Sequence, residues 1–455
     1  GVFQIESRAQ IAMLPRLRPT KFYDLVVEVA IVRPGPIQGG MIHPYLRRRN
    51  GQEDCDPPHP ILGPILDRTL GVPLFQEQVM QIAIDGAGYT GGEADRLRRD
   101  MAAWKKNGNL QAHRERLTRG FAKRGISSEF SERLFAQIQG FAEYGFPESH
   151  AASFALLVYA SSWLKVHHPA SFAAALVNSQ PMGFYSPSTI FEDARRHGVE
   201  VRRVAIDKSE WDCTLEDRAV RMGLRLVRGL GEESGTRIAQ ARGEGGMFTS
   251  VEDLAARASL QRGELDALAE AGALEPLVPG RREALWKVRA PRGEGLFARI
   301  DLGDGSPPMP PLTRSEQLVF DYESTGVSVD DHPMRLVRAS LPKRVRRSSG
   351  LATIPHGGSV VSAGMVICRQ RPRTASGVVF ITLEDEEGFI NLILYTKIFE
   401  RFRHVATTSG LLLVRGTIER DGEVIYIVTR KLEPLTVRDE ASGLVAMPSM
   451  SRDFH

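Results

Sequence analysis

The hydrophobic periodicity of the chain changes near Ser359, so no single repeated pattern accounts for all 455 residues. Before this point, apolar residues recur at the 3.6-residue spacing of amphipathic helices, as at Leu97, Met101 and Trp104. After it, β-branched and apolar residues alternate in short runs that predict strands. Five such runs follow one another, at residues 360–366, 378–383, 390–394, 411–416 and 424–428.

The order of the elements indicates several domains. A helix-compatible segment, 396–403, lies between the third and fourth runs, and five strands with this helix are typical of an OB barrel. Two helical units with glycine turns precede it, and a Pro-, Gly- and Arg-rich stretch separates them from the barrel. We therefore expect a multidomain α+β chain, with a large helical domain at 1–205, a tandem hairpin domain at 206–300, a linker with a short helix at 301–357, an OB-fold domain at 358–437 and a flexible tail at 438–455.

The composition is that of an ordinary globular protein, with 42% hydrophobic and 25% charged residues. The net charge of +4 is compatible with a polyanionic partner without requiring one. Cys55, Cys213 and Cys368 lack Cys-x-x-Cys spacing, which favours neither a disulfide framework nor a zinc site and indicates a reducing, cytoplasmic compartment. The longest apolar run, 151–164, is too short to cross a bilayer and predicts a buried helix and no membrane partner.

The start of the chain, Gly1-Val2-Phe3-Gln4, has neither an initiator methionine nor the features of a secretory signal. We expect the chain to be the carboxy-terminal part of a longer protein.

Cations crowd into a helical segment that begins near Gly91. Arginine matches phosphate oxygens with paired donors, while Lys105 and Lys106 supply point charges, so a triphosphate or a nucleic-acid backbone is a sensible ligand. A solvated helix face is the alternative. The cations are Arg96, Arg98, Arg99, Lys105, Lys106, Arg114, Arg116, Arg119, Lys123 and Arg124.

A second cluster lies at residues 143–150, where Gly145 and Pro147 predict a turn and Ser149 is expected to cap the following helix. The turn would place Tyr144 and His150 beside a helix N-terminus, whose free N–H groups favour phosphate. A structural role for a lone histidine beside an apolar helix is the alternative.

Residues 227–238 have the spacing of a helix-hairpin-helix turn. Gly229 and Gly231, with Arg228 before them, would let backbone N–H groups approach a DNA phosphate. Glu232 and Glu233 oppose such binding, so a DNA contact and a purely structural hairpin both remain open.

The barrel offers cations and aromatic rings suited to single-stranded nucleic acid, although core packing explains its phenylalanines equally well. These residues are Arg369, Arg371, Arg373, Phe380, Arg401, Phe402 and Arg403.

Catalytic residues are not expected in this chain. Two-metal phosphoryl transfer needs converging carboxylates, and the sole Asp-x-Asp motif, at 54–56, precedes a proline-rich loop. We therefore expect no catalytic residue and no metal ligand here.

Several ordered motifs resemble the fingers region of bacterial C-family DNA polymerases. These are Gly1-Val2-Phe3-Gln4-Ile5-Glu6-Ser7, Arg33-Pro34-Gly35-Pro36, Phe75-Gln76-Glu77-Gln78-Val79-Met80, Gly88-Tyr89-Thr90, Leu97-Arg98-Arg99 and Tyr144-Gly145-Phe146-Pro147-Glu148-Ser149-His150. The segments 147–150, 179–187, 193–198 and 451–455 resemble the error-prone, ImuC-type paralogs more than the replicative alpha subunit.

The resemblance implies fingers, a tandem helix-hairpin-helix domain and an OB barrel, in that order. It implies that Arg98 and Arg99 hold the incoming deoxynucleoside triphosphate and that Tyr144 and His150 close over it. It also implies an upstream palm whose aspartates bind Mg²⁺, so the isolated chain should bind primer-template DNA without extending it. The implied activity of the whole protein is damage-induced translesion synthesis.

The resemblance also bears on partners. Replicative members carry a clamp-binding motif that begins with Gln after the hairpins, whereas residues 293–297 read Gly-Glu-Gly-Leu-Phe. We therefore expect an accessory protein, rather than direct binding, to link the chain to the sliding clamp. A non-catalytic DNA-binding scaffold and the replicative paralog are the alternative functions.

Overall fold

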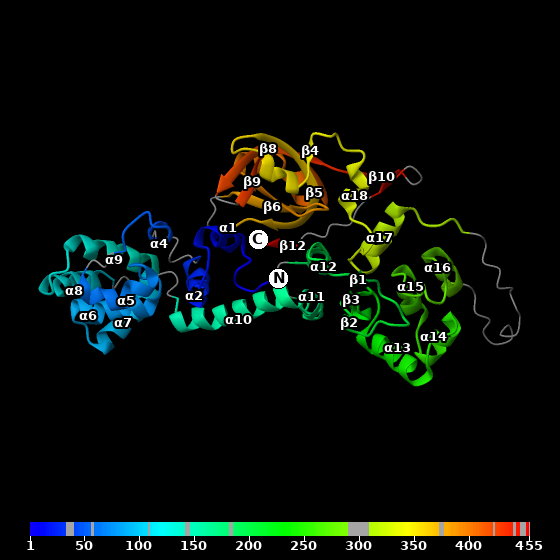
Figure 1. Cartoon of the computed structure of the whole chain (residues 1–455), viewed down its shortest axis with the longest axis horizontal. Helices are drawn as coiled ribbons and strands as arrows, with labels where there is room; N and C mark the ends of the chain where they lie inside the picture. The colour runs from blue at the N-terminus through cyan, green and yellow to red at the C-terminus, as the bar shows by residue number, and fades with distance from the viewer. Residues whose placement is uncertain are drawn as a thin grey trace, which may run out of the picture. The chain divides into compact units, whose positions relative to one another are not determined.

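The structure, a computed structural model, describes residues 1–32, 41–55, 59–107, 110–141, 146–181, 185–289, 309–372, 377–421, 424–439, 443–445 and 452–454. Their contacts divide into two compact units (Figure 1). The first consists mainly of Val2–Trp163, and the second mainly of Leu164–Asp421 and Ile425–His455. Each unit is described separately below.

The first unit is built from helices. Ser7 starts the first of them, because its side chain accepts a hydrogen bond from the N–H of Gln10. Gly120 allows two helices to approach closely, since a Cβ at this position would lie 2.1 Å from the carbonyl oxygen of Ala87. The helices are α1 (Arg8–Leu17), α2 (Phe22–Ile31), α4 (Ile42–Arg49), α5 (Gly63–Leu66), α6 (Gln76–Ala87), α7 (Gly91–Asn107), α8 (Leu110–Lys123), α9 (Ser128–Phe141) and most of α10 (Glu148–His167), with 3-10 turns η1 (Pro60–Leu62) and η2 (Asp67–Thr69).

Helix α10 is less buried than its sequence predicted. Ala151, Ala155 and Val158 are buried, whereas the side chains of Leu156 and Tyr159 are 60% and 55% exposed. The prediction of a buried helix was therefore wrong for one face, because the run is apolar on all sides while only one stripe packs.

The second unit begins with helices and a small sheet. The strands were not predicted from the sequence, because two or three residues are too few to show alternation. Its helical part comprises α11 (Pro169–Asn178), α12 (Pro187–Arg196), β1 (Val201–Arg202), β2 (Thr214–Glu216), β3 (Ala219–Arg221), η3 (Leu224–Leu226), α13 (Glu232–Gly245), α14 (Val251–Arg257), α15 (Arg262–Glu270) and α16 (Arg281–Arg289).

One hydrophobic core runs through this helical part. It includes Ala173, Val177 and Phe191 as well as Leu268 of the second hairpin, and it extends to Val327. The expected boundary at residue 205 therefore cuts through a continuous core, and the packing boundary lies near residue 164.

Part of the expected linker is also ordered by packing. Helix α17 (Arg314–Ser324) starts with a capping box between Thr313 and Glu316 and buries Leu318 and Tyr322. The carboxylate of Asp321, which is only 3% exposed, accepts a hydrogen bond from Arg203 at 3.1 Å and also pairs with the guanidinium of Arg281. Of this region, only residues 301–308 lie outside the described residues.

The five predicted barrel strands are all present, and the OB-barrel prediction is confirmed. The first and fourth strands pair antiparallel and the third and fifth pair parallel, which closes the barrel. The core contains Val366, Ile381, Leu392 and Val414. The elements are β5 (Ser359–Gln370), β6 (Val379–Glu384), β7 (Phe389–Leu394), α19 (Thr396–Arg401), α20 (Arg403–Thr408), β8 (Leu411–Asp421) and β9 (Val424–Pro434).

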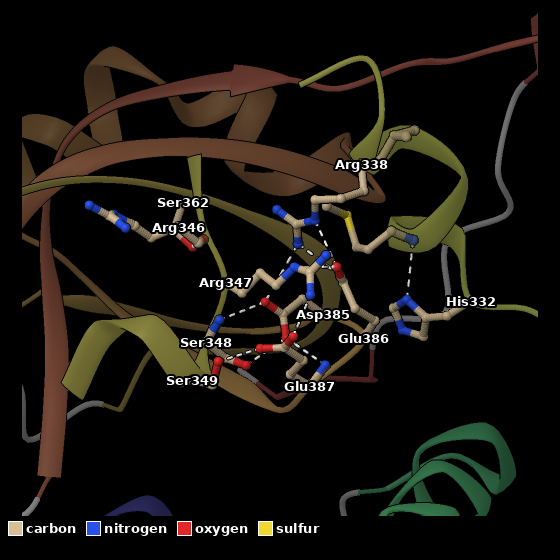
Figure 2. Close-up of polar contacts among 12 residues, drawn as sticks. His332, Arg338, Arg346, Arg347, Ser348, Ser349, Ser362, Asp385, Glu386 and Glu387 are labelled. Atoms are coloured by element: carbon tan, nitrogen blue, oxygen red, sulfur yellow. Dashed lines mark hydrogen bonds and ion pairs between the residues drawn. The ribbon is translucent and has the colours of Figure 1, made fainter. Parts of the chain in front are cut away.

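A buried aspartate fastens the segment before the barrel to the turn between β6 and β7. Figure 2 shows Asp385 accepting the backbone N–H of Ser348 at 2.7 Å and the Ser348 hydroxyl at 2.6 Å. The neighbouring Glu386 receives two hydrogen bonds from Arg338, at 2.7 and 2.8 Å. Helix α18 (Pro333–Arg338), β4 (Val345–Arg346) and η5 (Ser349–Thr353) are thus parts of the barrel's support rather than a free linker.

Short strands also occur in the expected tail. Strands β10 (Val437–Asp439) and β11 (Gly443–Val445) pair antiparallel. Strand β12 (Arg452–Phe454) pairs parallel with β5. Backbone pairing of this kind was not visible in the sequence, because each strand has only three residues.

Candidate nucleotide and DNA interface

Helix α7 carries the two arginines predicted to bind the triphosphate. Thr90 and Glu93 cap its start, since the N–H of Thr90 donates to Glu93 Oε2 at 2.7 Å. Arg98 and Arg99 both reach Asp95, with Nη2 to carboxylate distances of 3.0 and 2.9 Å. Their side chains are 38% and 66% exposed, so the pair remains accessible to a phosphate.

Asp95 lies between these two cations and neutralises one of them. Hydrogen bonding by Arg98 and the positive charge of Arg99 lower the pKa of the Asp95 carboxyl. Two guanidinium groups on one carboxylate leave a net charge of +1. The cluster can therefore attract a more highly charged anion that takes over these donors.

A partly buried polar chain, which was not predicted from the sequence, holds α7 against α8. His113 Nε2 lies 2.9 Å from Asp100 Oδ2, and its Nδ1 lies 3.3 Å from the hydroxyl of Tyr89. The Arg116 guanidinium lies over the Tyr89 ring at 4.9 Å. Asp100 and His113 are thirteen positions apart on different helices, so no local motif announces the pair.

The other cations of the basic segment are partly used within the fold. Arg114 pairs with Glu132 at 2.6 Å, and Arg116 donates to the carbonyls of Ala87 and Gly88. Lys105 and Lys106 lie in α7, but their side chains are outside the described residues. The segment is thus a mixture of structural arginines and accessible ones.

The start of α10 differs from the expectation in two ways. The helix begins at Glu148, so Ser149 lies inside it and is not the N-cap. The first N–H is also taken, because Glu148 donates to Glu77 Oε2 at 3.0 Å. A carboxylate therefore occupies the place where we expected free donors for phosphate.

His150 is nevertheless exposed. Its ring lies edge-on to Phe146 and Phe154, with centroid distances of 5.1 and 4.4 Å. Tyr144, its predicted partner, lies outside the described residues.

The first hairpin turn has the expected backbone shape. Gly229 has a φ of +88°, which favours glycine, and Gly231 precedes α13 with open space around it. Arg228 makes a hydrogen bond within the fold, because its Nη1 donates to the carbonyl of Glu323 at 2.9 Å. Glu232 and Glu233 are exposed in the first turn, so the hairpin's charge does not favour DNA.

The barrel presents cations beside aromatic rings. The Arg371 guanidinium lies over Phe399 and that of Arg401 over Phe402, each at 5.4 Å. Phe380 is half-buried on β6 and lies outside the barrel core, so it can contact a base. Arg373 lies outside the described residues.

Arg369 has a structural role instead. It is 8% exposed and donates to the carbonyls of Ala406 and Ser409, at 2.6 and 2.7 Å. The expectation that it faces single-stranded nucleic acid was wrong, because strand alternation at this position turns it toward α20.

The described residues show neither a side-chain cluster that could hold a metal ion nor a helix that could span a membrane. Within them, no three His, Cys, Asp or Glu side chains are grouped to hold a metal ion. Across the same residues, no helix is long and apolar enough to span a membrane.

Family models match three parts of the chain. Residues 1–125 match the bacterial DNA polymerase III alpha subunit finger domain, 198–284 a helix-hairpin-helix motif, and 360–435 an OB-fold nucleic acid binding domain. The chain thus combines regions similar to polymerase fingers, to a helix-hairpin-helix motif and to an OB-fold nucleic acid binding domain, and the predicted fold class is confirmed.

Individual relatives of the chain share a more specific name than the family models give. Error-prone DNA polymerases from Pseudomonas paraeruginosa and Pseudomonas aeruginosa are each 53% identical over 100% of this chain, which covers 45% and 44% of their lengths. The enzyme of the same name from Alkalilimnicola ehrlichii is 52% identical, again over 100% of this chain and 44% of its own length. The chain is therefore similar from end to end to the error-prone group, as its motifs predicted, and spans about half the length of these relatives.

Proposed function

We propose that this chain is the nucleotide-binding and DNA-binding part of an error-prone DNA polymerase that performs damage-induced translesion synthesis. The observation that supports this proposal is the 53% identity to error-prone polymerases across the whole chain. The match of residues 1–125 to polymerase fingers supports the same activity.

In this function Arg98 and Arg99 bind the incoming deoxynucleoside triphosphate. Fixed cations stabilise charge that develops on the triphosphate and the departing pyrophosphate. His150 and Tyr144 would close over the nucleotide, while Arg371, Phe380 and Arg401 would contact the template strand.

The proposed reaction also needs Mg²⁺, and we do not expect the residues named above to bind it. Among the described residues, no three His, Cys, Asp or Glu side chains are grouped to hold a metal ion. We expect the aspartates that bind it to lie in the portion of the longer protein that this chain does not span.

Primer extension by the complete protein tests the proposal. We expect it to extend a primer with Mg²⁺ and deoxynucleoside triphosphates, and to continue past an abasic site where a replicative polymerase stops. The 455-residue chain alone should bind the same primer-template without extending it. Binding without extension by the complete protein would favour the scaffold alternative instead.

Recruitment to the sliding clamp gives a separate prediction. Residues 293–297, which lie outside the described residues, lack the Gln and the acid of the replicative motif. We expect Gly293→Gln with Gly295→Asp to tighten clamp binding by about tenfold or more, equivalent to about 1.4 kcal/mol. Surface plasmon resonance with the clamp from the same organism measures the change. Tight clamp binding by the unaltered chain would contradict the accessory-protein hypothesis.

A further inference from the structure

A groove on the first unit carries cations that the proposed function does not use. Its volume is about 810 Å³, and it lies where the ends of α1 and α4, the start of α2 and the turn η2 meet. The lining has four cationic side chains and two acidic ones, which gives a net formal charge of +2. The charged residues are Arg18, Lys21, Asp24, Arg49, Asp67 and Arg68.

The floor of the groove is a closed ion pair. Arg49 donates to both carboxylate oxygens of Asp24 at 2.8 Å, and also to the carbonyl of Arg18 at 2.9 Å. Burial opposes ionisation of Asp24, but hydrogen bonds from Arg49 and the N–H groups of Thr20 and Lys21 hold its pKa at about 2. The Asp24–Arg49 pair on the floor therefore has no net charge, and both side chains already have hydrogen-bond partners within the protein.

The rim is different, because its cations have no acidic partner within the part of the chain that the structure describes. Arg18, Lys21 and Arg68 are exposed and form no ion pair with any described residue. The Arg68 guanidinium lies 5.9 Å from the centre of the Tyr23 ring. The N-terminal end of α2 adds partial positive charge beside Lys21.

Exposed aromatic rings adjoin this rim. Phe22, directly after Lys21, is 45% exposed and packs edge-on against Tyr159, which is 55% exposed, at a centroid distance of 6.4 Å. The Tyr23 hydroxyl donates to Glu148 Oε1 at 2.6 Å and so fixes the groove to the start of α10. A strip of unpaired cations beside exposed aromatic rings is the combination that binds single strands, through phosphate contacts and base stacking.

We propose that the groove bounded by Arg18, Lys21 and Arg68, together with Phe22, binds single-stranded DNA. The proposal rests on the proposed function, since it gives the polymerase a site for unpaired template beyond those on the barrel. The cations come from three separate elements around an open groove, which suits successive phosphates of a strand.

The test uses the 455-residue chain and a fluorescein-labelled 20-nucleotide oligo-dT, with binding followed by fluorescence anisotropy from 50 to 300 mM NaCl. The variant is Arg18→Gln with Arg68→Gln. The matched control is Arg47→Gln with Arg133→Gln, which removes two exposed arginines of the same unit that do not line the groove. Circular dichroism checks that both variants keep the wild-type helix content.

Loss of two phosphate contacts should reduce the salt-dependence slope by about 1.4, which corresponds to roughly 25-fold weaker binding at 0.1 M salt. Phe22→Ala should weaken binding by about fivefold or more with no change in slope, because stacking releases no counterions. The control pair should leave the slope within 0.3 of wild type, on the order of half a contact.

Three results would overturn the proposal. Equal slopes for the groove variant and the control would remove the groove from the DNA path and leave the proposed function intact. If inorganic pyrophosphate at 1 mM, on the order of a free phosphate ligand's working concentration, displaces the oligonucleotide and abolishes the difference, the groove is a site for free phosphates. If the unaltered chain binds no oligonucleotide, the DNA-binding part of the proposed function fails with it.

Discussion

Replacing both Arg98 and Arg99 with alanine in the complete polymerase should lower kcat/KM for nucleotide incorporation by about 10²- to 10³-fold, the usual cost of losing preorganised donors to a developing charge. The two guanidinium groups lie on an accessible face of α7 and share Asp95 as their only carboxylate among the described residues. A triphosphate offers more negative charge than this one carboxylate. The arginines can therefore exchange partners without leaving a buried charge unpaired.

Single-turnover incorporation of one nucleotide measures the effect, because it separates binding from chemistry. Arg96→Ala is the matched control, since Arg96 is an exposed arginine of the same helix that does not contact Asp95. Arg98→Lys with Arg99→Lys keeps the charge but loses the paired donors, so it should fall between wild type and the alanine variant. Unchanged incorporation by the alanine variant would remove both arginines from the nucleotide site.

The barrel could be predicted from sequence because its strands are long and alternate. Residues Ile390 to Leu394 show buried and half-buried positions in turn, as the pattern indicated. The region before it could not be predicted in the same way. Its proline and arginine content indicated a linker, yet Asp385 and Asp321 hold it through contacts with residues distant in the sequence.

The part of the candidate site that could be predicted from the sequence is the part that consists of residues adjacent in the chain. Arg98 and Arg99 adjoin in sequence and lie on one accessible helix face, whereas their shared contact with Asp95 was found only in the structure. The contact between Asp100 and His113 and the groove of Arg18 and Arg68 arise only from tertiary packing. Such sites have no spacing rule to reveal them.

Glu28 gives the chain a built-in sensitivity to alkaline pH. It lies within α2, is 0% exposed, and neither of its carboxylate oxygens has a hydrogen-bond partner among the described residues. Burial raises the pKa of the Glu28 carboxyl from 4.5 to about 8. The folded unit therefore binds a proton that the unfolded chain releases between these two values.

This proton linkage should destabilise the first unit as pH rises. The stabilising contribution is complete below pH 4.5 and is lost as pH increases through about 8. A shift of this size corresponds to at most about 5 kcal/mol, at about 1.36 kcal/mol per pH unit. Glu28→Gln stays neutral at every pH, so it should abolish most of the loss.

Hydrogen exchange of the peptide covering α2, corrected for intrinsic rates, measures the opening free energy between pH 6 and 9. In wild type this free energy should fall by about 1.36 kcal/mol per pH unit from pH 6 to about 8, about 2.7 kcal/mol in all, and level off above pH 8. Glu129→Gln, at an exposed position on α9, is the control and should follow wild type. If Glu28→Gln loses protection as steeply as wild type, Glu28 does not carry the proton and the alkaline loss has another source.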